Sequence, residues 1–307
     1  MRNAFADELT KLGAEDARVV MLSGDIGNRL FDKFKANHAP RFFNCGVAEA
    51  NMMGVAAGMA LCGLRPVIYT ITPFTTTRCF EQIRVDACYH NAPVVIVGTG
   101  SGLSYADLGP THHSLEDMAI LRTLPGMRVL APCDNTEMRL ALRAALREDG
   151  PVYIRIGKKG EPDIHPKVPE FRIGKGIVLR AGTDIALIAA GTIMPEALKA
   201  ADLLAQHGVS AELVSFHSVK PLDCEYLDRA CSRFKLLATI EEHGRIGGLG
   251  GAVAEWRASR RDAPLQISFG SGDEFMYEVG TQEYARAKFG LTASNIAEKV
   301  HAALRAN

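Results

Sequence analysis

A single carboxylate stands at the start of an apolar segment built from small residues. Glu49 follows the turn residue Gly46 and precedes the stretch 52–64, which contains no Lys or Arg. Apolar surroundings penalise an ionised carboxyl group, so such a Glu finds a partner or has its pKa raised. Two interpretations stay open on spacing alone. Glu49 either caps a helix and faces solvent, where the helix dipole favours carboxylates, or shares a proton with a ligand.

Two adjacent histidines form a second candidate site. His112 and His113 follow a predicted strand at 93–97 and the glycine-rich loop at 98–102. Open α/β sheets place their ligands at the carboxyl ends of strands, where such loops lie. Proton transfer or recognition of a substrate hydroxyl suits a pair of histidines.

Two structural interpretations of the histidine segment compete with that chemistry. Thr111 or Ser114 is placed to cap the helix that follows, which leaves the histidines unexplained. His113, Glu116 and Asp117 have the spacing of one helical face, which would suit a metal ion, but no suitable fourth ligand lies nearby. We therefore expect no metal ligand in this chain.

Alternating strand and helix patterns predict an α/β protein of two domains, each a mostly parallel sheet with helices on both faces. A polar segment with three prolines at 157–169 interrupts the alternation, which then restarts. We expect a first domain at 1–160, a linker at 161–172 and a second domain at 173–307. The predicted strands lie at 18–23, 66–71, 93–97, 127–131, 154–156, 184–189, 210–215, 235–241 and 266–269.

Composition excludes several classes of partner. The 307 residues are 47% hydrophobic and carry 35 basic and 35 acidic side chains, so nothing suggests binding to nucleic acid or to an anionic membrane. The seven cysteines are odd in number and form no C-x-x-C pair, which favours reduced thiols and a cytoplasmic location. The most apolar stretch, 52–64, is too short to span a bilayer.

Ordered motifs along the whole chain resemble one family. The motifs are Gly46-Val47-Ala48-Glu49, Asn51-Met52-Met53-Gly54, Phe80-Glu81-Gln82-Ile83-Arg84, Gly109-Pro110-Thr111-His112-His113, Val219-Lys220-Pro221-Leu222-Asp223 and Glu241-Glu242-His243. With these motifs the first half resembles the pyrimidine-binding domain of transketolases and 1-deoxyxylulose-5-phosphate synthases, and the second half resembles the last domain of the same enzymes. The chain is therefore similar to the C-terminal subunit of a split transketolase.

The resemblance implies a cofactor that this chain holds only in part. Family members bind the diphosphate of thiamine diphosphate and its Mg²⁺ through a Gly-Asp-Gly motif on a separate domain, and no Gly-Asp-Gly occurs here. The resemblance thus implies an N-terminal partner subunit that carries the diphosphate and metal site. It also implies an α2β2 assembly, and a chain that is inactive alone.

The same resemblance assigns cofactor contacts by position. Glu49 corresponds to the carboxylate that hydrogen-bonds the aminopyrimidine ring nitrogen and favours its imino tautomer. Phe74 corresponds to the aromatic that stacks on the pyrimidine, with a core Phe as the alternative. Asp25 is placed near the cofactor and substrate channel, with helix capping as the alternative, and Arg78 is placed among the cofactor contacts.

Substrate contacts are implied in the same way. His112 resembles the histidine that contacts substrate hydroxyls, with His113 as its neighbour and Asp25 close by. Arg155 follows the fifth predicted strand and is expected either to meet a substrate phosphate or carboxylate or to lie on the surface.

Two positions depart from the family pattern. Leu108 replaces an acid that would recognise an α-hydroxyl, and Asp107 is shifted by one position. Gly100 replaces a histidine or arginine, which removes a phosphate contact. The identity of the sugar or sugar-derived substrate is therefore left open.

Three functions remain in competition. The first is transfer of a two-carbon ketol unit from a ketose to an aldose. The second is acyl transfer from a 2-oxo acid, as in deoxyxylulose phosphate synthase or the β subunit of 2-oxo acid dehydrogenases. The third is a non-catalytic scaffold, against which the presence of Glu49 and His112 argues. Gly100 counts against the synthase, and the paired histidines count against the dehydrogenase.

Overall fold

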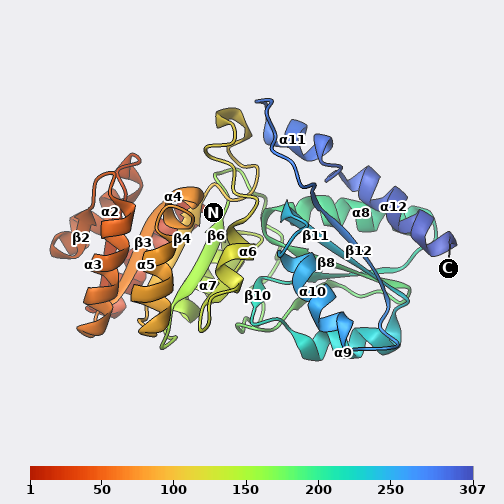
Figure 1. Cartoon of the computed structure of the whole chain (residues 1–307), viewed down its shortest axis with the longest axis horizontal. Coiled ribbons are helices and arrows are strands. Elements are labelled where there is room, and N and C mark those ends of the chain that lie inside the picture. The colour runs from red at the N-terminus through yellow and green to blue at the C-terminus, as the bar shows by residue number, and fades with distance from the viewer. Residues whose placement is uncertain (307) are drawn as a thin grey trace.

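The structure, a computed structural model, describes residues 1–306 and consists of two β-sheets, each covered by helices on both faces (Figure 1). The first sheet has the strand order β10-β5-β6-β4-β3-β1-β2, and the second has the order β12-β11-β8-β9-β7. All neighbouring strands are parallel except the pairs β10–β5 and β7–β9. The predicted fold class is therefore confirmed. The strands are β1 (Val19–Ser23), β2 (Phe42–Asn44), β3 (Arg65–Ile71), β4 (Val95–Thr99), β5 (Arg128–Leu130), β6 (Val152–Ile156), β7 (Ile177–Arg180), β8 (Ile185–Ala190), β9 (Ala211–Ser215), β10 (Ser218–Lys220), β11 (Leu236–Gly244) and β12 (Leu265–Ser271).

The helices fall between the strands, as the sequence pattern predicts. Those of the first domain are α1 (Arg2–Glu15), α2 (Asp32–His38), α3 (Glu49–Leu61), α4 (Thr72–Thr75), α5 (Phe80–Gln82), α6 (Asp117–Arg122) and α7 (Asn135–Ala145). Those of the second domain are α8 (Met194–Gln206), α9 (Cys224–Arg233), α10 (Leu249–Ala258), α11 (Gln282–Lys288) and α12 (Ala293–Arg305). None of the helices within residues 1–306 is long and apolar enough to cross a membrane.

The first sheet is buried on both faces. Helices α1, α2 and α7 cover one face through residues such as Phe5, Phe34 and Met138, while α3 and α6 cover the other through Met52 and Met118. Strands β1, β4 and β6 are accordingly buried along their whole length, as expected of a parallel sheet between two helical layers.

The two domains share one continuous hydrophobic core. Helices α8 and α12 cover one face of the second sheet. On its other face, Leu249 and Val253 of α10 belong to the same buried cluster as Met118 and Leu121 of α6.

A short strand of the second half also completes the first sheet. Strand β10 pairs antiparallel with β5, so that Ser218 lies opposite Leu130, and it runs between the two sheets (Figure 1). Residues 157–176 contain no helix or strand. The proposed boundaries of the linker within this segment stay a prediction.

Candidate active site

Glu49 is the first residue of α3 and is only 3% exposed. Its placement depends on the preceding turn, where Gly46 adopts a φ of 66° and accepts a hydrogen bond from the backbone N–H of Asp25 at 2.9 Å. The carboxylate is paired, because Nη1 of Arg78 lies 3.0 Å from both of its oxygens. Helix α3 itself supplies no cation, so the partner of this buried charge comes from 29 residues further along the chain.

Arg78 also joins Glu49 to an aromatic pair. Its guanidinium lies 4.1 Å from the centroid of the Phe74 ring, in a cation–π arrangement. The Phe74 ring in turn meets the imidazole of His112 edge-on, with centroids 5.4 Å apart. The structure therefore brings together four of the predicted residues, Glu49, Phe74, Arg78 and His112, which we call the Glu49 cluster.

Asp25 contacts the turn that precedes α3, because its backbone N–H donates to the Gly46 oxygen. It follows β1, is exposed, and accepts a hydrogen bond from Nδ2 of Asn44 at 3.3 Å. The helical turn that follows it begins after Gly27, and no side chain caps that turn. The capping alternative for Asp25 is therefore wrong, and its expected role near the cofactor stays a prediction.

The two adjacent histidines separate. His112 belongs to the Glu49 cluster, whereas His113 is buried, its Nε2 has no hydrogen-bond partner within residues 1–306, and burial lowers its pKa. His113 instead lines a cavity of about 380 Å³ between the domains, together with Glu116 and Arg245. His112 does not line this cavity. The expected role of His113 beside the substrate stays a prediction.

The expected position of Arg155, on the surface or in contact with substrate, needs correction. Arg155 lies within β6 and is 2% exposed. Its Nε donates to Oδ2 of Asp117 at 2.8 Å, and its Nη2 donates to Oδ1 of Asp117 at 3.1 Å and to the backbone oxygens of Ser114 and Glu242. Neither a surface position nor a substrate contact fits this geometry, because the guanidinium is committed to a buried ion pair within the first domain and to the backbone of Glu242 in the second.

The two structural alternatives for the histidine segment, a helix cap and a metal site, are also wrong. Helix α6 begins only at Asp117, and no side chain caps it, so the caps expected from Thr111 or Ser114 are absent. Asp117 is taken up by Arg155 and by the hydroxyl of Tyr153 at 2.6 Å. A metal site of His113, Glu116 and Asp117 is therefore excluded.

One of the two departures from the family pattern, Gly100, has a geometric cause. Gly100 has a φ of 75°, and a Cβ at this position would lie 1.9 Å from the ring of Tyr105, so no basic side chain fits there. Leu108 is exposed, and the neighbouring carboxylate of Asp107 pairs with Lys158 at 3.3 Å.

Two residues beside the Glu49 cluster were not expected. The Tyr105 ring lies 5.9 Å from that of His112, and Nζ of Lys158 lies 4.5 Å from the Tyr105 centroid. Tyr105 lies three residues after the glycine-rich loop at 98–102, so its position in the sequence could have identified it as a candidate. Lys158 lies 51 residues beyond Asp107 in a polar segment, where no pattern distinguishes it from a solvated lysine.

Comparisons with known families cover both domains. The profile described as "Transketolase, pyrimidine binding domain" matches residues 1–161, and that described as "Transketolase, C-terminal domain" matches residues 174–296.

Relatives of similar length carry transketolase names. The chain is 37% identical over 302 residues to the 6-deoxy-6-sulfo-D-fructose transketolase subunit SqwH of Clostridium sp. (strain MSTE9), covering 98% of this chain and 93% of that protein. It is 35% identical to one subunit of the apulose-4-phosphate transketolase of Phocaeicola vulgatus, covering 96% of this chain and 94% of that subunit. It is 36% identical to 1-deoxy-D-xylulose-5-phosphate synthase 1 of Geobacter sulfurreducens, covering 98% of this chain and 48% of that enzyme.

Solved structures agree with these relatives. A structure described as a split gene transketolase, inactive beta4 tetramer, superposes with a TM-score of 0.90 at 35% identity and covers 99% of this chain and 97% of the other. The transketolase of Campylobacter jejuni shares the fold, with a TM-score of 0.81 at 17% identity and 46% of its own chain covered. The chain therefore belongs to the transketolase family, whose members depend on thiamine diphosphate, and it is a subunit of the split form of this transferase.

Proposed function

We propose that this chain supplies the pyrimidine end of the active site of a two-subunit enzyme that moves a two-carbon ketol unit from a ketose to an aldose. The observation that carries the proposal is the Glu49 cluster. It combines a buried carboxylate at a helix start, an aromatic ring face and a histidine within one surface group. The whole-length similarity to two transketolase subunits supports ketol transfer over acyl transfer.

The cluster fits the aminopyrimidine ring of thiamine diphosphate. Phe74 offers a flat apolar face, and the Glu49 carboxylate can share a proton with a ring nitrogen. Burial strengthens such a hydrogen bond, because the local dielectric constant is low. When bound, the cofactor supplies the carbanion chemistry of ketol transfer, while Glu49 sets the protonation of the pyrimidine and His112 contacts substrate hydroxyls.

The diphosphate and Mg²⁺ do not fit this chain. Mg²⁺ demands an octahedral set of oxygen ligands that includes diphosphate oxygens, and the Gly-Asp-Gly sequence that family members use is absent. We therefore assign the diphosphate and metal site to an N-terminal partner subunit in an α2β2 assembly.

Helix α3 offers a surface for that assembly. Val55 is 40% exposed, and a Cβ on Gly58 would meet nothing within 4 Å inside this chain. Val55 and Gly58 thus give α3 an exposed apolar surface, C-terminal to Glu49, that suits close helix packing against another subunit.

The donor is proposed to be a ketose or a ketose derivative. The two named transketolase relatives act, by their names, on a sulfonated ketose and on a ketose phosphate. Gly100 leaves no basic side chain in the loop after β4, so Lys158 is the candidate contact for an anionic group near His112.

Reconstitution tests the proposal. The chain is co-purified with a partner that carries Gly-Asp-Gly, and retained thiamine diphosphate and Mg²⁺ are measured together with activity. We expect cofactor retention and turnover of hydroxypyruvate or a ketose only in the complex. Turnover of pyruvate with release of carbon dioxide would favour acyl transfer, and a complex that neither binds cofactor nor exchanges its thiazolium proton faster than free cofactor would favour the scaffold.

Arg78 provides a second prediction. Its guanidinium occupies the Phe74 face and the Glu49 carboxylate, the two groups that a pyrimidine ring needs, so it has to move when the cofactor binds. Its side chain is 45% exposed, so this ion pair contributes at most about 1 kcal/mol. Arg78→Met is therefore expected to tighten cofactor binding to the complex by up to about fivefold, measured by calorimetry.

The control for this measurement is Arg84→Met, which removes an exposed ion pair with Glu81 and should leave affinity unchanged. A tenfold weakening by Arg78→Met alone would instead identify Arg78 as a direct cofactor contact, as the resemblance implies.

A further inference from the structure

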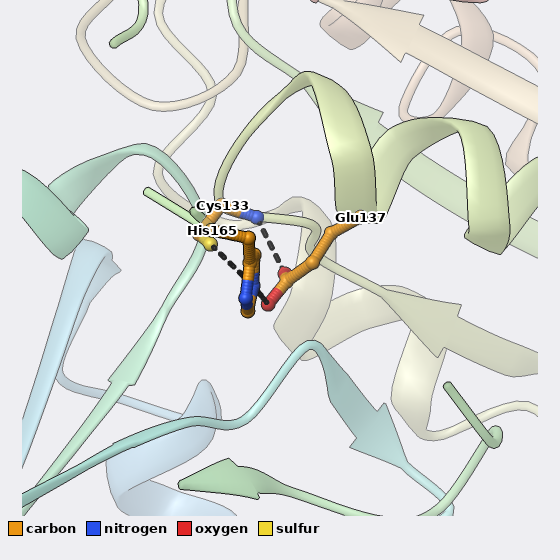
Figure 2. A group of neighbouring side chains, drawn as sticks. All are labelled: Cys133, Glu137 and His165. Carbon is orange, nitrogen blue, oxygen red and sulfur yellow. Dashed lines mark hydrogen bonds and ion pairs between the residues drawn. The ribbon is translucent and has the colours of Figure 1, made fainter. Parts of the chain in front are cut away.

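A second group of chemically active side chains lies far from the Glu49 cluster, at the junction of the two domains. Cys133 and Glu137 flank the start of α7, and His165 lies in the segment that connects the domains. Figure 2 shows the three side chains pointing toward one another. One ligand atom from each, the Sγ, a carboxylate oxygen and an imidazole nitrogen, lies within 4.8 Å of the other two.

The individual contacts are close. Nε2 of His165 is 2.8 Å from Oε1 of Glu137 and 4.0 Å from Sγ of Cys133. The other carboxylate oxygen of Glu137 accepts the backbone N–H of Cys133 at 2.8 Å. All three side chains are buried, so the group is shielded from competing solvent.

Asp134 fixes the backbone on both sides of the group. Its Oδ1 accepts the N–H of Glu137 at 2.8 Å and so caps α7. Its Oδ2 accepts the N–H groups of Ile164 and His165 at 2.8 and 3.0 Å. One carboxylate therefore orients the strand-to-helix turn and the connecting segment together, which is the kind of support that holds ligands in a fixed geometry.

Unsatisfied polar groups adjoin the three side chains. The Ser215 hydroxyl interacts with the side chains of Cys133 and Glu137, and the imidazole of His217 is buried beside the Glu137 carboxylate; within residues 1–306 neither the hydroxyl nor the two ring nitrogens make a hydrogen bond of good geometry. Burial lowers the pKa of His217, and the nearby Glu137 carboxylate opposes that shift. Buried polar atoms normally make well-formed hydrogen bonds, so these groups have bonding capacity left for a further species at this junction.

The chemistry of the set points to a borderline-soft divalent cation. Thiolate, imidazole and carboxylate are the ligands that Zn²⁺ takes in proteins, usually in tetrahedral geometry. With Zn–S and Zn–N bonds of about 2.3 and 2.0 Å, a tetrahedral site separates sulfur and nitrogen by about 3.5 Å. The observed 4.0 Å requires only a small adjustment of side chains.

We propose that Cys133, Glu137 and His165 form a structural site for one Zn²⁺ ion, with a bound water in the fourth position. Ser215 and His217 would provide that water with hydrogen-bond partners. Binding displaces the thiol proton of Cys133 to solvent, because the thiolate is the ligand. The ion would link the first domain to the segment that connects it to the second domain. This proposal replaces our expectation that the chain holds no metal ligand.

Metal titration of the full-length chain, alone and in its complex, tests this site. After treatment with a chelator, the protein is titrated with Zn²⁺ and, as a spectroscopic probe, with Co²⁺. We expect one equivalent bound, and with Co²⁺ a thiolate-to-metal charge-transfer band together with the visible bands of tetrahedral cobalt. Absence of the charge-transfer band in the unmutated chain would overturn the proposal without reference to any variant.

Variants assign the site. Cys133→Ala and His165→Asn should each weaken Zn²⁺ binding at least tenfold and remove the rise in melting temperature that Zn²⁺ gives the unmutated chain. Cys88→Ala, which removes a buried thiol elsewhere, is the matched control and should keep both the band and the rise. Equal binding by Cys133→Ala and Cys88→Ala, with both folded by circular dichroism, would place the metal elsewhere and refute the assignment.

Discussion

Glu49→Gln is expected to lower kcat of the reconstituted enzyme by about 10²–10⁴-fold, the usual contribution of a positioned acid or base. The substitution keeps the size and shape of a side chain that is buried at the start of α3. It removes only the ability to share a proton with the pyrimidine ring. Little stability should be lost, because the Arg78 partner is half exposed and can turn to solvent.

Steady-state kinetics and exchange of the thiazolium proton at saturating cofactor measure this effect. Glu81→Gln is the control, since it changes an exposed carboxylate that pairs only with Arg84 in the same region. Both variants should show the melting temperature of the parent. If Glu49→Gln kept more than a tenth of the parental exchange rate, the role of this carboxylate in cofactor protonation would be disproved.

Arg155→Ala is expected to destabilise the chain by about 3–5 kcal/mol, because it leaves the Asp117 carboxylate buried without its cation. The bidentate pair is almost fully inaccessible, and Arg155 also bonds the backbone of Glu242 in the second domain. Urea denaturation measures the loss of unfolding free energy. Lys at the same position should be intermediate, since an ammonium cannot reproduce both contacts.

The pH dependence of this effect has a definite sign. Burial raises the pKa of Asp117, but Arg155 and His243 outweigh burial and hold it below its usual value. A depressed carboxyl pKa gives stability that is present at neutral pH and is lost as the pH falls through that pKa. The gap between parent and Arg155→Ala should therefore be widest near neutral pH and should shrink as the pH falls, because protonation of Asp117 removes the unpaired buried charge in the variant. An unchanged unfolding curve with a raised KM would instead restore Arg155 as a substrate contact.

Periodicity in the sequence was sufficient for the α/β architecture. Largely apolar runs such as 66–71 and 93–97 lie on or overlap β3 and β4, because both faces of these strands are covered by helices. Three short strands, β2, β7 and β10, were missed. The pairing of β10 with β5 depends on contacts with residues about 90 positions away that no local pattern encodes.

Individual site residues were less predictable. Glu49 stood out because a charge in an apolar segment needs a partner, yet the identity of that partner, Arg78, follows from tertiary structure alone. Arg155 was misassigned because an arginine is seldom fully buried, and its partner Asp117 lies 38 residues away. The proposed metal ligands were missed for the same reason, as His165 and Glu137 are 28 residues apart across a proline-containing segment.

Strand β10 has a consequence for the autonomy of the two domains. If the chain were severed between residues 157 and 176, the first sheet would lose its outermost strand and β5 would become an unpaired edge, open to association with other chains. The apolar seam between α6 and α10 would be exposed at the same cut. The two halves are thus interdependent in folding, and the connecting segment is a tether within one cooperative unit rather than a hinge between separable modules.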